Sequence, residues 1–191
     1  MKHVLITGTG RCGTTFLVEL LTHLGFDTGF SVDNLERYKF SKARAGLEIG
    51  IHHIGSPRIR KRPLTAQGID VFIRSGRAEK IIMPIRILEH AVQSRVNQQG
   101  AIKNQFVPGG LEGTLDPSKQ GEVYLWLVYN MLYHASLQQV PVFLMQFPKI
   151  VKDAQYLYDC LEAVFGVEMP TFPVFEQIFN EVAKPELITV K

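Results

Sequence analysis

Apolar residues along this chain alternate between short unbroken runs and longer stretches at helical spacing. Residues 3–7 (HVLIT) form a β-branched run bounded by glycine, which is typical of a buried strand. In the stretch that follows, apolar residues recur at intervals of three and four positions until Gly25: Phe16, Leu17, Leu20, Leu21 and Leu24. The chain is therefore predicted to begin with a strand, a glycine-containing loop and a helix.

Two further pairs of a strand and a helix follow in the same order. Residues 79–86 (EKIIMPIR) predict a buried strand despite Pro84, and residues 89–96 predict a helix. Residues 140–147 predict another strand, and residues 152–166 predict an amphipathic helix. Strands that alternate with helices indicate an α/β fold with a central parallel sheet and helices on both faces, which is a three-layer arrangement.

Two segments stand apart from this alternation. Residues 122–139 are apolar almost all round, which predicts a long helix at the centre of the molecule. Residues 97–121 are rich in glycine and proline and predict a long mobile loop. Loops of that length are usually functional or disordered, so we expect this one to close over a site when ligands bind.

Composition narrows the class of protein. The 191 residues suit a single domain spanning 1–191, and 46% hydrophobic with 20% charged residues is ordinary for a globular protein. A net charge of +3 favours anionic ligands weakly and falls short of a nucleic-acid-binding signature. No apolar run approaches the ~20 residues of a membrane span, and the first ten residues do not form a secretory signal, so we expect a cytoplasmic protein. Cys12 and Cys160 are expected to be free thiols.

The loop after the first strand carries the clearest chemistry. Residues 8–13 have the G-x-x-x-x-G spacing of a Walker A phosphate loop, but Thr14 stands where an ATPase or GTPase has lysine. The backbone N–H groups of residues 10–15, with the positive end of the following helix, are suited to a phosphate-like anion. Arg11 can supply the missing positive charge. The sequence of this segment therefore predicts a P-loop that binds an anion without the usual lysine.

Nucleotide triphosphate hydrolysis is disfavoured by the ends of the other strands. It requires Mg²⁺ and a strand that ends in aspartate, whereas the predicted strands end in Arg86 and in Gln146 and Phe147. No metal is therefore expected. A phosphatase with Cys12 as nucleophile is excluded as well, because that chemistry places arginine about six positions later, where this chain has Val18.

At residues 8–17 (GTGRCGTTFL) the chain resembles the 5′-phosphosulfate-binding loop of the sulfotransferase family, in which a basic residue is followed by S-G-T-T. Arg11, Gly13, Thr14 and Thr15 match that motif, and Cys12 stands where serine is common. The resemblance implies a three-layer fold built on a P-loop. It also implies that the donor is 3′-phosphoadenosine 5′-phosphosulfate (PAPS).

A second element of that family is similar in this chain. In the family an arginine ends a strand and a serine follows eight positions later, and the two bind the 3′-phosphate of the donor; Arg86 and Ser94 have that spacing. Ile87 and Leu88 depart from the acidic residue and proline that usually follow the arginine. Looser similarities extend the resemblance over residues 2–166.

One of these looser similarities is a strand with a lysine near a proline, for which the chain offers Lys61 and Pro63. Lys61 is expected to point inwards and to stabilise the transition state of transfer. Its basic neighbours Arg58, Arg60 and Arg62 are expected to form a solvated edge.

The resemblance implies metal-independent transfer of a sulfuryl group from PAPS to a hydroxyl or amine of a small molecule, a glycan or a lipid. The residues expected to bind the donor are Gly10, Arg11, Cys12, Gly13, Thr14, Thr15, Arg86 and Ser94. The alternatives are a P-loop kinase of a small molecule or nucleoside, and a catalytically inactive homologue that binds the donor.

The general base of such a transfer is histidine or glutamate in this family. Candidates between the first helix and the basic segment are Glu36, Glu48, His52 and His53. We prefer Glu48 because partial burial in its apolar, glycine-bounded context (AGLEIG) would raise its pKa towards a useful value. His53 is the second candidate.

Overall fold

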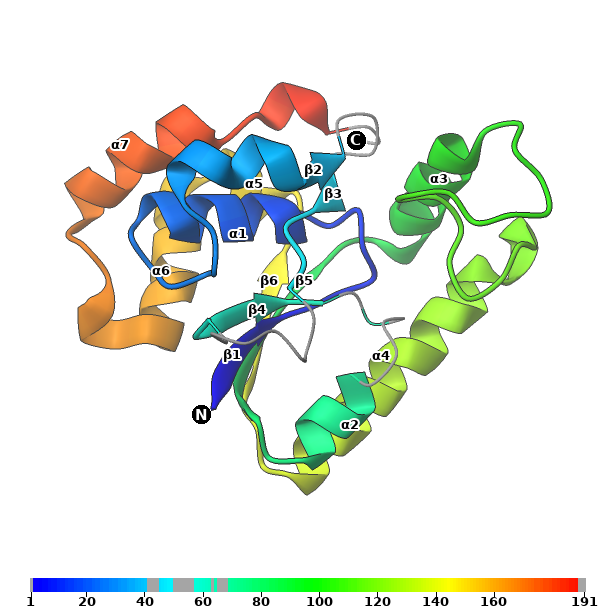
Figure 1. Cartoon of the computed structure of the whole chain (residues 1–191), viewed down its shortest axis with the longest axis horizontal. Coiled ribbons are helices and arrows are strands. Elements are labelled where there is room, and N and C mark those ends of the chain that lie inside the picture. The colour runs from blue at the N-terminus through cyan, green and yellow to red at the C-terminus, as the bar shows by residue number, and fades with distance from the viewer. Residues whose placement is uncertain (1, 41–44, 50–56, 63, 65–68, 189–191) are drawn as a thin grey trace.

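The computed structural model of the chain describes residues 2–40, 45–49, 57–62, 64 and 69–188. Within these residues the protein is an α/β fold around a four-stranded parallel sheet with the strand order β4-β1-β5-β6 (Figure 1). The strands are β1 (His3–Ile6), β4 (Ile59–Lys61), β5 (Ala78–Ile85) and β6 (Val142–Gln146). The predicted parallel sheet is confirmed.

Helices cover both faces of this sheet. Because side chains alternate along a strand, Val4 and Ile6 of β1 point to one face and Leu5 to the other. The first face packs against α1 (Thr14–His23), α5 (Lys149–Lys152) and α6 (Ala154–Phe165), and α7 (Phe172–Val182) packs against α1 and α6. The second face packs against α2 (Ile69–Arg74) and α4 (Gln120–Leu137). Two apolar cores on opposite sides of the sheet therefore hold the molecule together, as a three-layer fold requires.

The remaining elements are a helix after β5, a small antiparallel pair and four short 3₁₀ helices. The helix α3 (Leu88–Gln99) follows β5 and packs against α4. A small antiparallel pair is formed by β2 (Lys39–Phe40) and β3 (Ala45–Gly46). The short 3₁₀ helices are η1 (Val32–Tyr38), η2 (Pro117–Lys119), η3 (Gly166–Glu168) and η4 (Pro185–Leu187).

The strand order brings three distant segments to one edge of the sheet. The strand β1 lies between β4 and β5, and Ile6 pairs with both Lys61 and Ile82. Since parallel strands end at the same edge, the loop after β1, the end of β4 and the chain after β5 meet there. Ligand sites of open parallel sheets form at this edge.

The position of α4 corrects the sequence-based expectation that this helix is central. Only its inner side is buried, at Tyr124, Met131 and Ala135, together with Gln120 at its first residue. Its outer side exposes six large apolar side chains: Leu125, Trp126, Tyr129, Leu132, Tyr133 and Leu137. An apolar pattern around a whole helix does not show which side faces the core, because exposed surfaces also contain apolar residues.

The predicted 97–121 loop is shorter than expected, because α3 extends through Gln99 and α4 begins at Gln120. The hydrophobic pattern did not predict α2 and α7. Among the described residues, no helix combines the length and the apolar character that crossing a membrane requires.

Candidate anion-binding site

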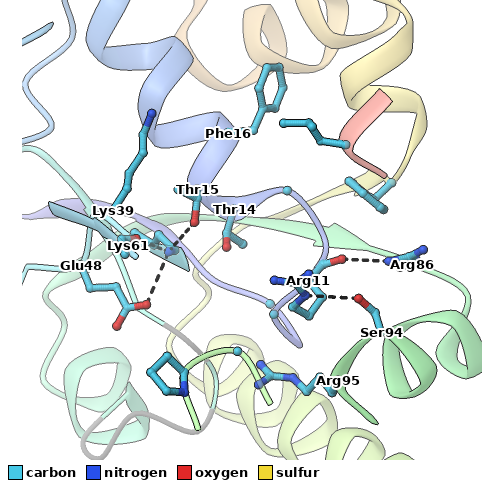
Figure 2. Close-up of a pocket in the computed structure, with 18 of the residues that line it drawn as sticks. Arg11, Thr14, Thr15, Phe16, Lys39, Glu48, Lys61, Arg86, Ser94 and Arg95 are labelled. Carbon is cyan, nitrogen blue, oxygen red and sulfur yellow. Dashed lines mark hydrogen bonds and ion pairs between the residues drawn. The ribbon is translucent and has the colours of Figure 1, made fainter. Parts of the chain in front are cut away.

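A cavity of about 1000 Å³ opens at the carboxyl edge of the sheet (Figure 2). Segments from the whole chain surround it: the 8–13 loop, α1, the end of β4, α3, residues 106–113 and residues 182–188. Ten of the candidate residues singled out from the sequence line it: Gly10, Arg11, Gly13, Thr14, Thr15, Glu36, Glu48, Lys61, Arg86 and Ser94. His52, His53 and Pro63 lie outside the described residues.

The 8–13 loop turns through left-handed backbone conformations. Gly10, Arg11 and Gly13 have φ angles of 71°, 57° and 86°. Gly13 is the N-cap of α1, and a Cβ added there would lie 3.0 Å from the ring of Phe147. A left-handed φ is unfavourable for the non-glycine Arg11. Successive left-handed residues curve the backbone into a concave loop of the kind that collects N–H groups around an anion.

Cys12 is the one residue of the expected donor set whose side chain does not line the cavity. It is fully buried beneath the loop, and this burial raises the pKa of its thiol. A contact between Cys12 and a ligand would therefore come from its backbone N–H.

Lys61 points into the cavity from the end of β4, as the sequence predicts, and its side chain is only 5% exposed (Figure 2). Its Nζ donates to Thr15 Oγ1 at 2.9 Å and to the carbonyl oxygen of Gly46, and lies 3.4 Å from Glu48 Oε1. Burial lowers the pKa of Lys61, and Glu48 opposes that change. The ammonium group therefore links the start of α1 to the opposite wall of the cavity.

The other basic residues around Lys61 do not all form the expected solvated edge. Arg60 is buried, with 2% of its surface exposed, which corrects that expectation. Arg58 lies at the surface and pairs with Glu168. All three residues of β4 are buried, so neither face of this strand is exposed to solvent. An alternation of buried and exposed residues is therefore not seen there.

Glu48 faces the cavity, but its side chain is 45% exposed. The partial burial that favoured Glu48 as a base is therefore much weaker than the sequence suggested. Its contact with Lys61 is the structural feature that ties it to the site.

Arg86 and Ser94 both contact the 8–13 loop (Figure 2). Nη1 of Arg86 donates to the carbonyl oxygen of Arg11 at 3.2 Å, and the guanidinium lies 5.0 Å from the ring centroid of Phe147. The buried Ser94 accepts a hydrogen bond from Arg11 Nε at 3.2 Å. The two sequence elements, 83 residues apart, thus form one continuous surface.

Arg95 is a residue of the site that sequence analysis missed. Its side chain is 6% exposed and forms an ion pair with Glu112. Nε and Nη2 donate to the carbonyl oxygen of Thr9 at 3.2 and 3.0 Å, and Nη1 donates to that of Gly110 at 2.6 Å. The sequence signal is only its place beside Ser94, because an arginine on an amphipathic helix is usually solvated.

The 100–116 segment is irregular, but two glutamine side chains hold it in place. Gln99 Nε2 donates to the carbonyl oxygens of Ile102 and Gln105, and its Oε1 accepts from Leu111 N. The fully buried Gln120 binds both backbone groups of Glu112, at 2.7 and 2.9 Å. This segment therefore forms a wall of the cavity, and its closure on ligand binding stays a prediction.

Glu112 is the carboxylate that this wall contributes to the cavity. Burial raises its pKa, Arg95 lowers it, and the negative charge of Glu48 raises it further. At the other end of the cavity, Lys39 Nζ lies 2.6 Å from Glu19 and 2.7 Å from Glu36. The cavity therefore combines buried, paired cations with carboxylates of differing exposure.

Comparison of the chain with protein-family models, with curated proteins and with solved structures gave no significant match. The cavity is suited to a ligand with more than one phosphate-like group. It contains a concave loop at a helix N-terminus, the hydroxyls of Thr14 and Thr15, and the nearby cations Arg11, Lys61 and Arg86.

Proposed function

We propose that this protein is a sulfotransferase that moves a sulfuryl group from PAPS to a hydroxyl or amine acceptor without a metal ion. The observation that carries the proposal is the direct contact between the two expected donor-binding elements. Arg11 of the 8–13 loop donates to Ser94, and Arg86 donates to the backbone of Arg11. A donor with a 5′-phosphosulfate and a 3′-phosphate needs two anion subsites side by side, and this arrangement supports such a pair.

The proposed division of labour follows the chemistry of the residues. The N–H groups of the P-loop, residues 10–15, and the hydroxyls of Thr14 and Thr15 bind the 5′-phosphosulfate. Arg86 and Ser94 bind the 3′-phosphate, for which a guanidinium is a strong charge-assisted donor.

In the transfer step, the acceptor oxygen or nitrogen attacks the sulfur in line and forms the new bond to it. The bond from sulfur to the bridging oxygen breaks, and its electron pair leaves with the phosphate. Lys61 and the loop N–H groups stabilise the charge that develops on this leaving group, which is catalysis by positioning and electrostatics. The proton of the acceptor passes to a base, for which Glu48 remains the sequence-based prediction and its pairing with Lys61 is the supporting contact.

Ligand-dependent thermal stability tests donor binding. Adenosine 3′,5′-bisphosphate without metal should stabilise the folded protein by about 2.7 kcal/mol when present at 100 times its Kd. Adenosine 5′-monophosphate at the same concentration should stabilise it less, because it leaves the Arg86 and Ser94 subsite empty. Equal stabilisation by the two ligands would contradict the roles of Arg86 and Ser94.

Substitution of Arg86 tests the 3′-phosphate subsite directly. Arg86→Ala should remove ~1.5–3 kcal/mol of the preference for the bisphosphate, the usual worth of a hydrogen bond to a charged group. Arg74→Ala is the matched control, because Arg74 lies on α2 with a side chain 52% exposed and does not line the cavity.

Turnover with a sulfur-labelled donor and a panel of phenol, sugar and amine acceptors separates the remaining alternatives. Transfer of label supports the proposal. Binding of the bisphosphate without transfer indicates an inactive homologue, and stabilisation only by ATP with Mg²⁺ indicates a kinase.

A further inference from the structure

Among the described residues, apolar side chains line the cavity in two places. One group, which includes Phe147, continues the apolar core on the α1 side of the sheet and lies beside Arg86. The other group is part of the 100–116 segment, is called the 106–111 wall below, and consists of Phe106, Val107, Pro108 and Leu111. In the proposed complex the 3′-phosphate binds Arg86, which places the attached nucleoside at the first group. The 106–111 wall is then left for the acceptor.

The 106–111 wall adjoins the 8–13 loop. The guanidinium of Arg95 donates to the carbonyl oxygen of Thr9 in that loop at 3.0 Å and to that of Gly110 in the wall at 2.6 Å. One side chain therefore holds the anion-binding loop and the wall against each other. A ligand group bound at the 8–13 loop would lie close to the wall.

Electrostatic contacts place the wall on the side of the cavity where transfer is proposed to occur. Figure 2 shows Lys61 and Glu48 on one side of the 8–13 loop and Arg86 on the other. Burial raises the pKa of Glu112, which follows Leu111, Arg95 lowers it, and the charges of Glu48 and Lys61 also act on it. The wall therefore lies within electrostatic reach of the proposed base and of the ammonium group that stabilises the leaving phosphate.

The surface that the wall offers to a ligand is mainly apolar. Phe106 lines the cavity with 58% of its surface exposed. Three backbone carbonyl oxygens of the segment are already engaged within the protein: that of Gln105 by Gln99, that of Val107 by Gly110 N, and that of Gly110 by Arg95. Pro108 has no N–H group to offer. A sugar buries several hydroxyls that each need a polar partner, so this wall suits an apolar ring better than a glycan.

The exposure of Glu48 favours the same kind of acceptor. Its side chain is 45% exposed, so water still reaches the carboxylate. A carboxylate in contact with water is a weak base and removes a proton more readily from an acidic hydroxyl. The hydroxyl of a phenol ionises near pH ~10, as in tyrosine, and is far more acidic than that of an alcohol.

We infer that the acceptor is an aryl alcohol whose flat ring packs on Phe106 while its hydroxyl faces Lys61 and Glu48. This inference rests on the proposed function, because it names the acceptor of the proposed transfer. The aryl oxygen forms the new bond to sulfur and its proton passes to Glu48. The bond from sulfur to the bridging oxygen breaks, and its electron pair leaves with the phosphate. Offset or edge-to-face packing of two aromatic rings contributes beyond the apolar area that it buries.

The test measures acceptor binding by calorimetry on protein saturated with adenosine 3′,5′-bisphosphate, so it does not depend on turnover. 2-Naphthol is compared with decahydro-2-naphthol, which has the same carbon skeleton and hydroxyl but no aromatic ring, and with methyl glucoside. We expect 2-naphthol to bind about tenfold more tightly than the saturated analogue, and more tightly still than the glucoside. With sulfur-labelled PAPS, kcat/KM for 2-naphthol should exceed that for the saturated analogue by ~10²-fold or more, because the aryl hydroxyl is also the more acidic one.

Variants of Phe106 test the contact itself. Phe106→Ala should weaken 2-naphthol about tenfold and the saturated analogue less than about threefold, because only the aryl ligand loses a ring contact. The Kd of the bisphosphate should stay within about twofold, since most substitutions of exposed side chains have small effects. Phe106→Tyr keeps the ring and should bind 2-naphthol nearly as the wild type does. Ile102→Ala is the matched control, because Ile102 is 46% exposed in the same segment and does not line the cavity.

The possible outcomes separate the inference from the proposed function. Tighter binding of methyl glucoside than of 2-naphthol would overturn the inference and leave the proposed function intact. Unchanged binding of 2-naphthol by Phe106→Ala, or an equal loss for the saturated analogue, would overturn it as well. A large loss of bisphosphate affinity in Phe106→Ala would assign the wall to the donor and overturn it too. A wild type that does not bind the bisphosphate would reject the proposed function, and the inference with it.

Discussion

At the scale of single residues, the pair formed by Lys61 and Glu48 most directly constrains the chemistry of the cavity. Lys61 is almost fully buried and Glu48 is half exposed, although the two side chains are in contact. Burial lowers the pKa of Lys61, and the carboxylate of Glu48 partly restores it. Glu48 therefore has two possible roles, as the acceptor's base and as the group that keeps Lys61 charged.

Replacement of Glu48 by glutamine separates these roles. If Glu48 is the base, Glu48→Gln should leave the affinity for adenosine 3′,5′-bisphosphate nearly unchanged and lower turnover by ~10²-fold or more. The loss of the carboxylate also lowers the pKa of Lys61 further, so the alkaline limb of the pH–rate profile should move to lower pH. Donor affinity and pH–rate profiles are measured on the same variant. A large loss of affinity would instead identify Glu48 as a structural partner of Lys61.

At the scale of elements, α4 shows how one helix can serve both the core and the site. Its inner side buries Tyr124, which packs beneath Arg95, and its first residue Gln120 holds Glu112. Its outer side leaves Trp126 64% exposed. The stability of the molecule should therefore depend on the inner side only.

Two neighbouring aromatic residues of α4 test this difference. Tyr124→Ala should lower the free energy of unfolding by about 3 kcal/mol or more, as for other large side chains removed from a core. Trp126→Gln, two positions later, should change it by no more than about 0.5 kcal/mol, as for most surface substitutions. Chemical denaturation of both variants measures the two values. A loss of several kcal/mol in Trp126→Gln would show that the outer side is covered in solution.

At the scale of the whole molecule, the parallel sheet begins with a buried histidine. His3 opens β1 with 4% of its surface exposed, and its Nδ1 lies 2.8 Å from the carbonyl oxygen of Pro57. Burial lowers the pKa of His3 from its ordinary value of 6.5. The folded state therefore binds a proton at His3 less readily than the unfolded state does.

The sign of the resulting pH dependence follows from linkage. The unfolded state binds more protons below pH 6.5, so the contribution of His3 to stability is complete above that value. It declines as the pH falls through 6.5 and levels off below the pKa of the folded state. His3→Gln should remove this part of the decline, and the difference between wild-type and variant free energies of unfolding from pH 5 to 8 measures it. Parallel curves for the two proteins would contradict the prediction.

Local patterns in the sequence predicted most of the sheet and the loop at its edge. The strands at residues 3–7, 79–86 and 140–147 are dominated by apolar residues, as strands of a parallel sheet covered on both faces usually are. The edge strand β6 is the least buried of them, with Leu144 52% exposed. The 8–13 loop was recognisable because glycine at fixed spacing between a strand and a helix reflects the conformation of the backbone itself. These features need no information from distant parts of the chain.

The roles of individual side chains around the cavity were decided by the tertiary structure. Periodicity shows which residues share a face but not whether that face meets the core, so the burial of Arg60 and the exposed side of α4 were not predictable. The exposure of Glu48 and the contacts of Arg95 likewise depend on segments 13 to 86 positions away. These contacts form only because β1 lies between β4 and β5 in the sheet. The sequence alone predicted β1, β5, β6, most of the long helices and the glycine loop after β1. Strand order decided which side chains surround that loop, because that order sets the long-range neighbours of each residue.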